Sequence, residues 1–256
     1  MALVRTALVT GAARGIGRGI ALRLASDGLN VVLNDIPSNG PALKSLGSDI
    51  ERMGRRSSIF TADVSDEKQV KGMVASAVEE MGGLDVMVAN AGICEISTIL
   101  DITPEGLERI FAVNVRGVVY CYKHAAKQMI EQGRGGRIIG AASVVALQGE
   151  PALLAYTMSK HAVRGLTHSA AVELAKHGIT VNAYAPGSID TDMLAKVAEG
   201  SEGIPEENTK KFLTGIPAGR LGQPSDIAQL VSFFASEKSS FVTGQTVTSN
   251  GGTVLT

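Results

Sequence analysis

The sequence predicts one doubly wound α/β domain, in which a parallel sheet of about seven strands carries helices on both faces. Two observations lead to this fold class. Short apolar runs alternate with stretches of helical periodicity along nearly all of the 256 residues, a pattern typical of β-α-β units. No linker rich in Pro, Ser and Gly interrupts the alternation, so residues 1–256 are expected to form a single domain.

The expected strands are short and mostly apolar, as in parallel sheets whose strands are buried on both faces. The first, Thr-Ala-Leu-Val-Thr at residues 6–10, stops at Gly11. Right-handed crossovers and short connections leave few ways to arrange such strands in one sheet. The strands are expected at residues 6–10, 30–35, 57–62, 84–89, 136–143, 179–184 and 245–248.

Helices are indicated by apolar residues at helical spacing and by signals at their N-termini. Asp66 stands where an acidic N-cap is expected, and Pro104 suits a first helical turn. The pattern that follows Pro104 is long, and it should bend near residues 115–117. The helices are expected at residues 15–28, up to about 53, 66–81, 104–132, in the segment that contains Tyr156, and at 225–236.

The stretch from residue 186 to residue 224 differs from the rest of the chain. It is rich in glycine, proline and polar residues and has no clean periodicity. We expect a mobile lobe with one or two short helices, of which residues 187–222 form a lid over the substrate.

Composition excludes several classes of function. Hydrophobic residues make up 45% and charged residues 19% of the chain, as in ordinary globular proteins. The formal net charge of −1 leaves no electrostatic footprint for nucleic acid or an anionic membrane surface. No apolar run approaches the roughly 20 residues of a membrane span. The two cysteines, Cys94 and Cys121, have no partners at metal-ligand spacing, so we expect no metal and a cytoplasmic protein.

A glycine-rich loop lies between the first strand and the first helix. It reads Thr10-Gly-Ala-Ala-Arg-Gly-Ile-Gly17. Glycines at Gly11, Gly15 and Gly17 permit a tight turn and close packing, and the free N–H groups at the helix start can hold a pyrophosphate. The spacing differs from the common Gly-x-Gly-x-x-Gly, and a turn chosen only for packing is the alternative. The position at a strand-to-helix junction favours dinucleotide binding.

Asp35 ends the second strand, 18 residues after Gly17, where a carboxylate can bind the adenosine ribose. The same carboxylate would repel the 2′-phosphate of NADP. Two like charges about 4 Å apart, at an effective dielectric constant of about 20, repel each other by about 4 kcal/mol. Arg14 is a possible partner for that phosphate and would favour NADP. We therefore predict NAD(H), while an ordinary helix-capping role for Asp35 remains the alternative.

Tyr156 and Lys160 are four residues apart, so in a helix their side chains lie on the same face. A lysine charge about 4 Å away could lower the phenol pKa by roughly 3 units, or about 4 kcal/mol, enough to make a proton shuttle. For an isolated pair, a half-buried tyrosine beside a solvated lysine is the more common explanation. Other motifs in the chain are needed to distinguish the proton shuttle from this structural explanation.

Together these motifs resemble the classical short-chain dehydrogenase/reductase family over about residues 4 to 252. The glycine loop is similar to the family's cofactor loop, Asp63-Val64 to its adenine contact, and Asn90-Ala-Gly92 to its Asn-Asn-Ala-Gly stretch, with Ala89 in place of the first asparagine. Ser249-Asn250 stands where many members have Val-Asp. The resemblance implies a Rossmann-type fold, and these positions for cofactor binding: Gly11, Arg14, Gly15, Ile16, Gly17, Asp35, Asp63, Val64, Asn90, Ala91, Gly92, Tyr156, Lys160, Pro186, Gly187, Ile189 and Thr191.

The resemblance also implies a catalytic tetrad of Asn114, Ser143, Tyr156 and Lys160. In this family the serine holds the substrate oxygen, the tyrosine transfers the proton, and the lysine lowers the phenol pKa and binds the nicotinamide ribose. Asn114 supports a helix kink and a water that links Lys160 to solvent. The same resemblance implies a homotetramer.

Substrate identity is less well marked. Ser143, Val145, Gln148 and Tyr156 are the expected substrate residues, and Cys94 and Glu95 are further pocket candidates. Overall the chain is similar to acetoin (2,3-butanediol) dehydrogenases and to 3-oxoacyl-carrier-protein reductases. We expect an NAD-dependent dehydrogenase that converts a secondary alcohol into a ketone, with an NADP-dependent 3-oxoacyl or sugar/polyol reductase as one alternative. A non-catalytic NAD(H) sensor or scaffold is an alternative of another class.

Overall fold

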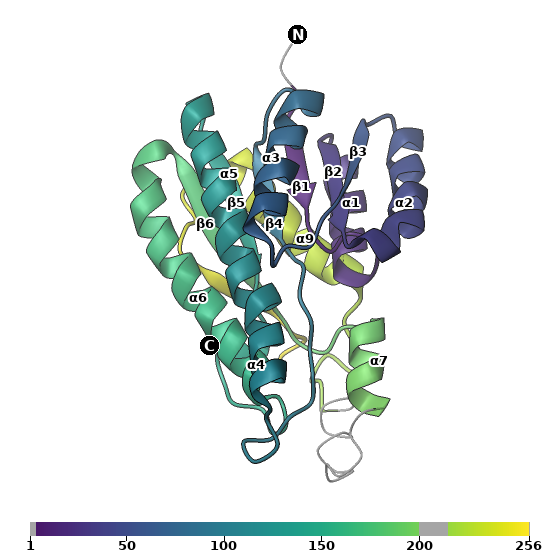
Figure 1. Ribbon diagram of the computed structural model, residues 1–256, viewed down its shortest axis with the longest axis vertical. Helices are drawn as coiled ribbons and strands as arrows, with labels where there is room; N and C mark the ends of the chain where they lie inside the picture. Colours follow the sequence, from purple (N-terminus) through teal and green to yellow (C-terminus); the bar gives the residue numbers. More distant parts are fainter. Residues whose placement is uncertain (1–3, 200–214, 256) are drawn as a thin grey trace.

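The structure is a computed structural model that describes residues 4–199 and 215–255 (Figure 1). Its described strands form one seven-stranded sheet in the order β3-β2-β1-β4-β5-β6-β7, and every neighbouring pair is parallel. The strands are β1 Thr6–Val9, β2 Asn30–Asp35, β3 Ser57–Thr61, β4 Val86–Ala89, β5 Gly136–Ala141, β6 Ile179–Pro186 and β7 Thr246–Ser249. The predicted fold class is confirmed.

Helices cover both faces of the sheet (Figure 1). One buried core lies between the sheet and α3, α5 and α6, and the other lies between the sheet and α1, α2 and α9. The described α-helices are α1 Gly15–Ser26, α2 Gly40–Arg52, α3 Glu67–Met81, α4 Pro104–Phe111, α5 Val118–Gln132, α6 Leu154–Leu174, α7 Asp192–Glu199 and α9 Pro224–Ala235.

The strand order reverses between β1 and β4. From β1 the chain proceeds through β2 to β3 on one side, and it then returns to place β4 on the other side of β1. In open α/β sheets, ligands bind in the crevice at the carboxyl ends of the strands at such a reversal. In Figure 1 the loops after β4 and β5 and helix α7 lie together toward the lower end of the molecule.

The long helix predicted after Pro104 consists of three segments. Between α4 and α5 the residues Ala112–Gly117 form a π-helix, η2, at the position of the predicted bend. The predicted N-caps are also present: Asp66 accepts hydrogen bonds from the backbone N–H groups of Lys68 and Gln69, and Pro104 occupies the first turn of α4. Among the described helices, none is both long and apolar enough to cross a bilayer.

Only part of the predicted lobe can be compared with the structure. Its described portion includes α7 and an isolated bridge between Ile189 and Gly222. Residues 200–214 of the expected 187–222 lid lie outside the described residues.

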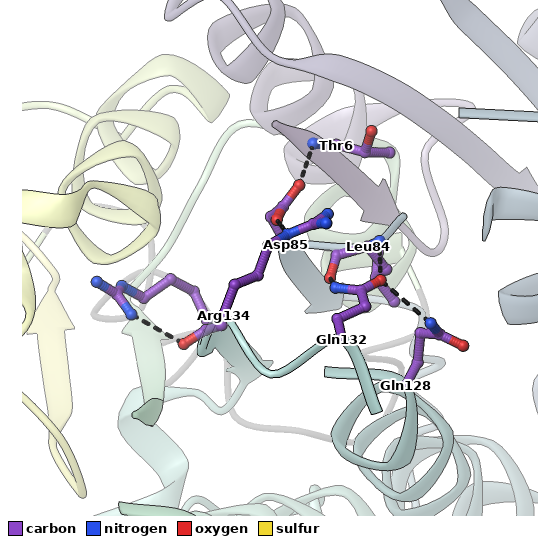
Figure 2. Close-up of polar contacts among 8 residues, drawn as sticks. Thr6, Leu84, Asp85, Gln128, Gln132 and Arg134 are labelled. Atoms are coloured by element: carbon purple, nitrogen blue, oxygen red, sulfur yellow. Dashed lines mark hydrogen bonds and ion pairs between the residues drawn. The ribbon is translucent and has the colours of Figure 1, made fainter. Parts of the chain in front are cut away.

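A polar cluster at the amino end of β4 joins three parts of the chain (Figure 2). The buried carboxylate of Asp85 accepts from the backbone N–H of Thr6 at 2.8 Å and from Nε of Arg134 at 2.8 Å. Beside it, the side-chain amide of Gln132 pairs with both backbone groups of Leu84, at 2.8 and 2.9 Å. Leu84, predicted as the first residue of β4, lies outside the strand, which begins at Val86, because a side chain takes the place of a neighbouring strand at its backbone groups.

Replacing Asp85 by alanine should destabilise the fold by about 2–4 kcal/mol, because a buried N–H and a guanidinium both lose a charged acceptor. In thermal unfolding, this corresponds to a fall in Tm of roughly 4–16 °C for a chain of this size. Glu131→Ala, which removes an exposed carboxylate from α5, should leave Tm nearly unchanged. Equal Tm values for the two variants would contradict this role for Asp85.

Candidate active site

The glycine loop adopts a conformation that requires its glycines. Gly11 and Gly15 have φ values of 63° and 53°, in the left-handed region that side chains disfavour. A Cβ at Gly17 would overlap the carbonyl oxygen of Gly11 and lie 2.6 Å from Nδ2 of Asn90. No side chain caps the start of α1, so its first N–H groups are available to a ligand.

Asn90 holds this loop against the sheet. Its Nδ2 donates to the carbonyl oxygens of Thr10 at 2.8 Å and Gly11 at 3.1 Å. The backbone N–H groups of Asn90 and Ala91 both donate to Oγ1 of Thr10 at 3.0 Å. Asn90 in turn accepts from the phenol of Tyr184 at 2.7 Å. In the sequence, nothing distinguishes Tyr184 from an ordinary core tyrosine in a buried strand, so its contact with Asn90 could not be predicted.

Asp35 lies over the same loop. Its carboxylate accepts from the backbone N–H of Ala13 at 3.1 Å, from that of Ile36 at 2.9 Å and from Nδ2 of Asn39 at 2.8 Å. A carboxylate has about four lone-pair sites, so three donors leave room for one hydroxyl. The carboxylate is therefore fixed beside the loop and can still accept from a ribose.

The remaining cofactor candidates lie on both sides of the crevice. Arg14 forms an exposed ion pair with Asp192 of α7 at 3.3 Å. A Cβ at Gly15 would lie 3.3 Å from Cγ2 of Thr191, so the segment after β6 reaches the glycine loop. On the other side, the carboxylate of Asp63 accepts from the backbone and hydroxyl of Ser65. The expected cofactor residues Val64 and Ile189 are buried, Ile16 packs against the core beneath α1, and Gly187, which follows Pro186, packs closely against Asn250.

The four expected catalytic residues come from three neighbouring elements. Tyr156 and Lys160 lie one turn apart on α6, with Nζ of Lys160 5.3 Å from the centroid of the phenol ring. Ser143, at the end of β5, forms a hydrogen bond with Tyr156. Nζ of Lys160, which is 3% exposed, donates to the carbonyl oxygen of Ala141 at 2.8 Å. The helix and the strand end thus bring Ser143, Tyr156 and Lys160 into one group.

Asn114 occupies the π-helix and is fully buried. Its Oδ1 accepts from the backbone N–H of Ile93 at 2.9 Å, and its Nδ2 donates to the Ile93 carbonyl at 2.8 Å and to Oγ of Ser159 at 3.1 Å. A Cβ at Gly92 would lie 3.3 Å from Oδ1 of Asn114 and 3.5 Å from Nζ of Lys160. Asn114 therefore joins the loop after β4 to the helix that carries Tyr156.

The electrostatics differ from the sequence-based expectation. Burial raises the pKa of the Tyr156 phenol, the Cys94 thiol adds to this, and the hydrogen bond with Ser143 opposes it. Burial also lowers the pKa of Lys160 to about 8. The predicted lowering of the phenol pKa by Lys160 is therefore wrong for the protein alone. Nζ of Lys160 lies 5.3 Å from the ring centroid. Lys160 is buried and Tyr156 is half-buried, and removal from water disfavours the charged form of both groups.

The expected substrate residues are only partly brought together. Ser143 contacts Tyr156 and also accepts from the backbone N–H of Val145 at 3.4 Å, whereas Gln148 is exposed in the loop before α6. Burial raises the pKa of the Cys94 thiol to about 11, so this thiol is protonated at neutral pH. Within the described residues, no group of three or more His, Cys, Asp or Glu side chains could hold a metal ion.

These observations fit a dinucleotide. The loop has no space for side chains at two of its glycines, the start of α1 presents N–H groups without a capping side chain, and a fixed carboxylate stands where a ribose would lie. Beyond them, at the carboxyl ends of β4 and β5, lie a phenol, a hydroxyl and a buried amine. Such a site can hold a nucleotide at one end and transfer a proton at the other.

The chain is similar to known proteins over nearly its full length. A family model described as enoyl-(acyl carrier protein) reductase matches residues 11–254. A short-chain dehydrogenase/reductase of Armillaria gallica is 49% identical over 98% of this chain and 96% of its own length. The L-2,3-butanediol dehydrogenase of Corynebacterium glutamicum is 44% identical over 97% and 98%.

A solved structure is similar as well. The crystal structure of levodione reductase superposes with a TM-score of 0.90 and 32% identity, covering 97% of this chain and 96% of that one. The match in sequence and in fold extends through the glycine loop, the central strands and the Tyr156 helix. The chain therefore belongs to the short-chain dehydrogenase/reductase family of oxidoreductases.

Proposed function

We propose that this protein is an NAD-dependent oxidoreductase that interconverts a secondary alcohol and a ketone by hydride transfer, with Tyr156 as the general acid/base. The observation that supports it most directly is the convergence of Ser143, Tyr156 and Lys160 at the sheet edge that also carries the glycine loop. A bound nicotinamide would accept the hydride in one direction and donate it in the other.

The protein's own residues would handle the oxygen and its proton. The Ser143 hydroxyl would bind the substrate oxygen and stabilise charge that develops there. The phenol of Tyr156 would give a proton to that oxygen during ketone reduction and take one during alcohol oxidation. The ammonium of Lys160 would hold the nicotinamide ribose, while Asn114 keeps the loop after β4 and α6 in register through Ile93 and Ser159.

We also propose that the cofactor is bound by the residues that the sequence predicts for it. Gly11, Gly15 and Gly17 would admit the pyrophosphate, Asp35 the adenosine ribose, and Asp63 with Val64 the adenine. The segments Asn90-Ala-Gly92 and Pro186–Thr191 would lie on either side of the nicotinamide. Residues 187–222 would then act as the lid.

NAD is proposed over NADP because of Asp35. Its carboxylate is fixed by three N–H donors and would repel a 2′-phosphate. Arg14, the residue that could attract that phosphate, is paired with Asp192. Wild type should therefore have a higher kcat/KM with NAD(H) than with NADP(H), and the opposite order would contradict the proposal.

An Asp35→Ala variant should narrow that gap, since it removes both the repulsion and the ribose acceptor. Repulsion of about 4 kcal/mol corresponds to roughly a thousandfold change in the ratio of the two kcat/KM values, and loss of the ribose hydrogen bond adds to that change. Asp35→Asn is the matched variant, because it removes the charge but keeps the size. If Asp35→Asn leaves the ratio at its wild-type value, charge repulsion is not the cause of the preference.

The substrate proposed is a small or medium hydroxy compound, as with the butanediol dehydrogenase to which the chain is similar. Similarity to the 3-oxoacyl-(acyl-carrier-protein) reductase of Staphylococcus aureus favours a second candidate, an NADP-dependent reductase of 3-oxoacyl ketones. A screen of secondary alcohols and ketones with both cofactors, monitored by the fluorescence of NADH or NADPH, distinguishes the two candidate functions. Turnover of a 3-oxoacyl thioester with NADPH alone would favour the second.

We also propose that the protein is a homotetramer in the cytoplasm. Large apolar side chains are exposed on α6 (Val172), on α9 (Phe233) and near the edge strand β7 (Phe241 and Val247). Apolar surface of this kind is common at interfaces between subunits. Sedimentation at micromolar protein should give the mass of four chains, and a monomer mass would contradict the tetramer.

A further inference from the structure

Tyr184 connects the core of the sheet to the glycine loop. It lies on β6, is 1% exposed and packs in the core on the α1 and α9 side. Its phenol donates to Oδ1 of Asn90 at 2.7 Å. Asn90 follows β4, and β5 lies between β4 and β6, so the tyrosine side chain spans a whole strand. Its neighbour on β5 is Ala141, whose methyl group leaves room for the ring.

The amide of Asn90 is the other half of this connection. Its Nδ2 donates to the carbonyl oxygens of Thr10 and Gly11, both in the turn that leads into α1. It also packs so closely on Gly17 that an added Cβ there would lie 2.6 Å away. If the amide were rotated by half a turn, Oδ1 would face those two carbonyl oxygens. A donor on the other side of the amide therefore selects the orientation that binds the loop.

The phenol is suited to be that donor. A Tyr hydroxyl can donate or accept, but opposite a carbonyl oxygen it can only donate. Burial raises the pKa of Tyr184 well above its ordinary value, so the hydroxyl keeps its proton at every pH at which such an enzyme is assayed. The connection is thus permanent and does not act as a pH switch.

We propose that Tyr184 is a positioning residue for the dinucleotide: its phenol fixes the Asn90 amide, which holds the Thr10 and Gly11 carbonyls and so keeps the first N–H groups of α1 directed at the pyrophosphate. The inference rests on the proposed function only in that the loop binds a nicotinamide dinucleotide. Without the phenol the amide has other orientations. Only a fraction of the molecules then has the loop in its binding conformation, and the measured affinity falls by that fraction.

The test is the affinity of a Tyr184→Phe variant for NADH, measured by fluorescence titration. Loss of one hydrogen bond that holds the loop should raise Kd by about 3- to 10-fold. At saturating NADH and substrate, kcat should change by less than about 2-fold, because the reacting groups are untouched. A merely structural role would lower Tm without changing Kd.

Tyr122→Phe is the matched control. Tyr122 is also a buried tyrosine, 3% exposed, and it packs in the core on the opposite side of the sheet. Its phenol contacts Oγ1 of Thr167 at 3.2 Å, and that hydroxyl keeps its own bond to the Val163 carbonyl when the phenol is removed. The control loses the same atom from an equally buried site, so its Kd for NADH should equal that of wild type.

A second variant tests the route. If Tyr184 acts through Asn90, Asn90→Ser should raise Kd as well, and adding Tyr184→Phe to it should raise Kd no further. Additive effects would overturn the inference, as would equal Kd values for Tyr184→Phe and wild type, or equal increases in Tyr184→Phe and Tyr122→Phe. If Tyr184→Phe does not fold, an Asn90→Ser variant that folds and binds NADH like wild type overturns it.

The proposed function can fail separately from this inference. Wild type that binds NADPH but not NADH would refute the choice of cofactor, and the same titrations with NADPH would then decide the role of Tyr184. Wild type that binds neither dinucleotide would overturn both.

Discussion

Replacing Tyr156 by phenylalanine should reduce kcat by about 10²–10⁴-fold, the usual contribution of a general acid/base. The change removes a single oxygen atom, the one that would exchange a proton with the substrate. The ring remains, and so does the contact with Lys160 over its face. Affinity for NADH should therefore stay within about 2-fold of wild type, which fluorescence titration checks.

This variant also separates an enzyme from a sensor or scaffold that binds the dinucleotide without turnover. Tyr122→Phe, which removes a buried phenol from α5, should retain wild-type kcat and shows that loss of a core hydroxyl is not itself the cause. Turnover that survives in Tyr156→Phe would refute the assignment of the proton to this residue. Loss of NADH binding together with activity would instead point to a structural role.

The raised pKa of Tyr156 gives the reaction a pH dependence with a definite sign. Burial keeps the phenol protonated at neutral pH, which is the form that ketone reduction needs. Alcohol oxidation needs the deprotonated form, so its kcat/KM should rise with pH, while that of reduction should not. Tyr156→Phe should remove the rise together with the activity.

Much of the fold could be predicted from the sequence because it follows from local patterns. Buried parallel strands are short apolar runs, and helix starts carry Asp66 and Pro104, so the seven strands and most helices lie where they were expected. The bend at the π-helix also has a local signal in the sequence, since Asn114 is a poor helix former. The structure adds what occupies its side chain, namely the backbone of Ile93 and the hydroxyl of Ser159.

Contacts between distant parts of the chain could not be predicted in this way. Tyr184 and Asn90 are 94 residues apart, and Arg14 and Asp192 are 178 apart. Their meeting depends on strand order and register, which no single motif specifies. The direction of the Tyr156 pKa shift could not be predicted from local patterns either. Spacing along a helix brings Lys160 near Tyr156, but only the packing of the whole site determines how far both are removed from water.

Replacing Lys160 by methionine should abolish most activity and yet make the protein more stable at pH 7. The pKa of the buried ammonium falls to about 8 from an ordinary value of 10.5, which corresponds to a cost of about 3 kcal/mol for holding the charge in the folded state. Methionine has a similar length and no charge. It loses the hydrogen bond to the Ala141 carbonyl, worth about 1 kcal/mol, so the net gain is about 2 kcal/mol.

The sign of this effect depends on pH. At pH 7 the lysine is protonated in both the folded and the unfolded chain, and the folded state bears the whole cost. Between pH 8 and 10.5 the unfolded chain binds more protons, so the stability of wild type rises with pH. Above that range both states are neutral and the cost is gone. The advantage of Lys160→Met should therefore shrink through this window and reverse above it, where only the lost hydrogen bond to the Ala141 carbonyl remains.

Thermal unfolding of both proteins across this range, together with kcat, tests the role of Lys160. At pH 7 the variant should melt roughly 4–8 °C higher than wild type and turn over at least about 100-fold more slowly. Lys44→Met, which removes an exposed lysine from α2, should change neither quantity. A stabilised variant that keeps its activity would make Lys160 a structural residue, while an inactive variant with lower stability would contradict the burial cost. Higher stability with lost activity is the outcome expected when a site keeps a charge that the fold alone would exclude.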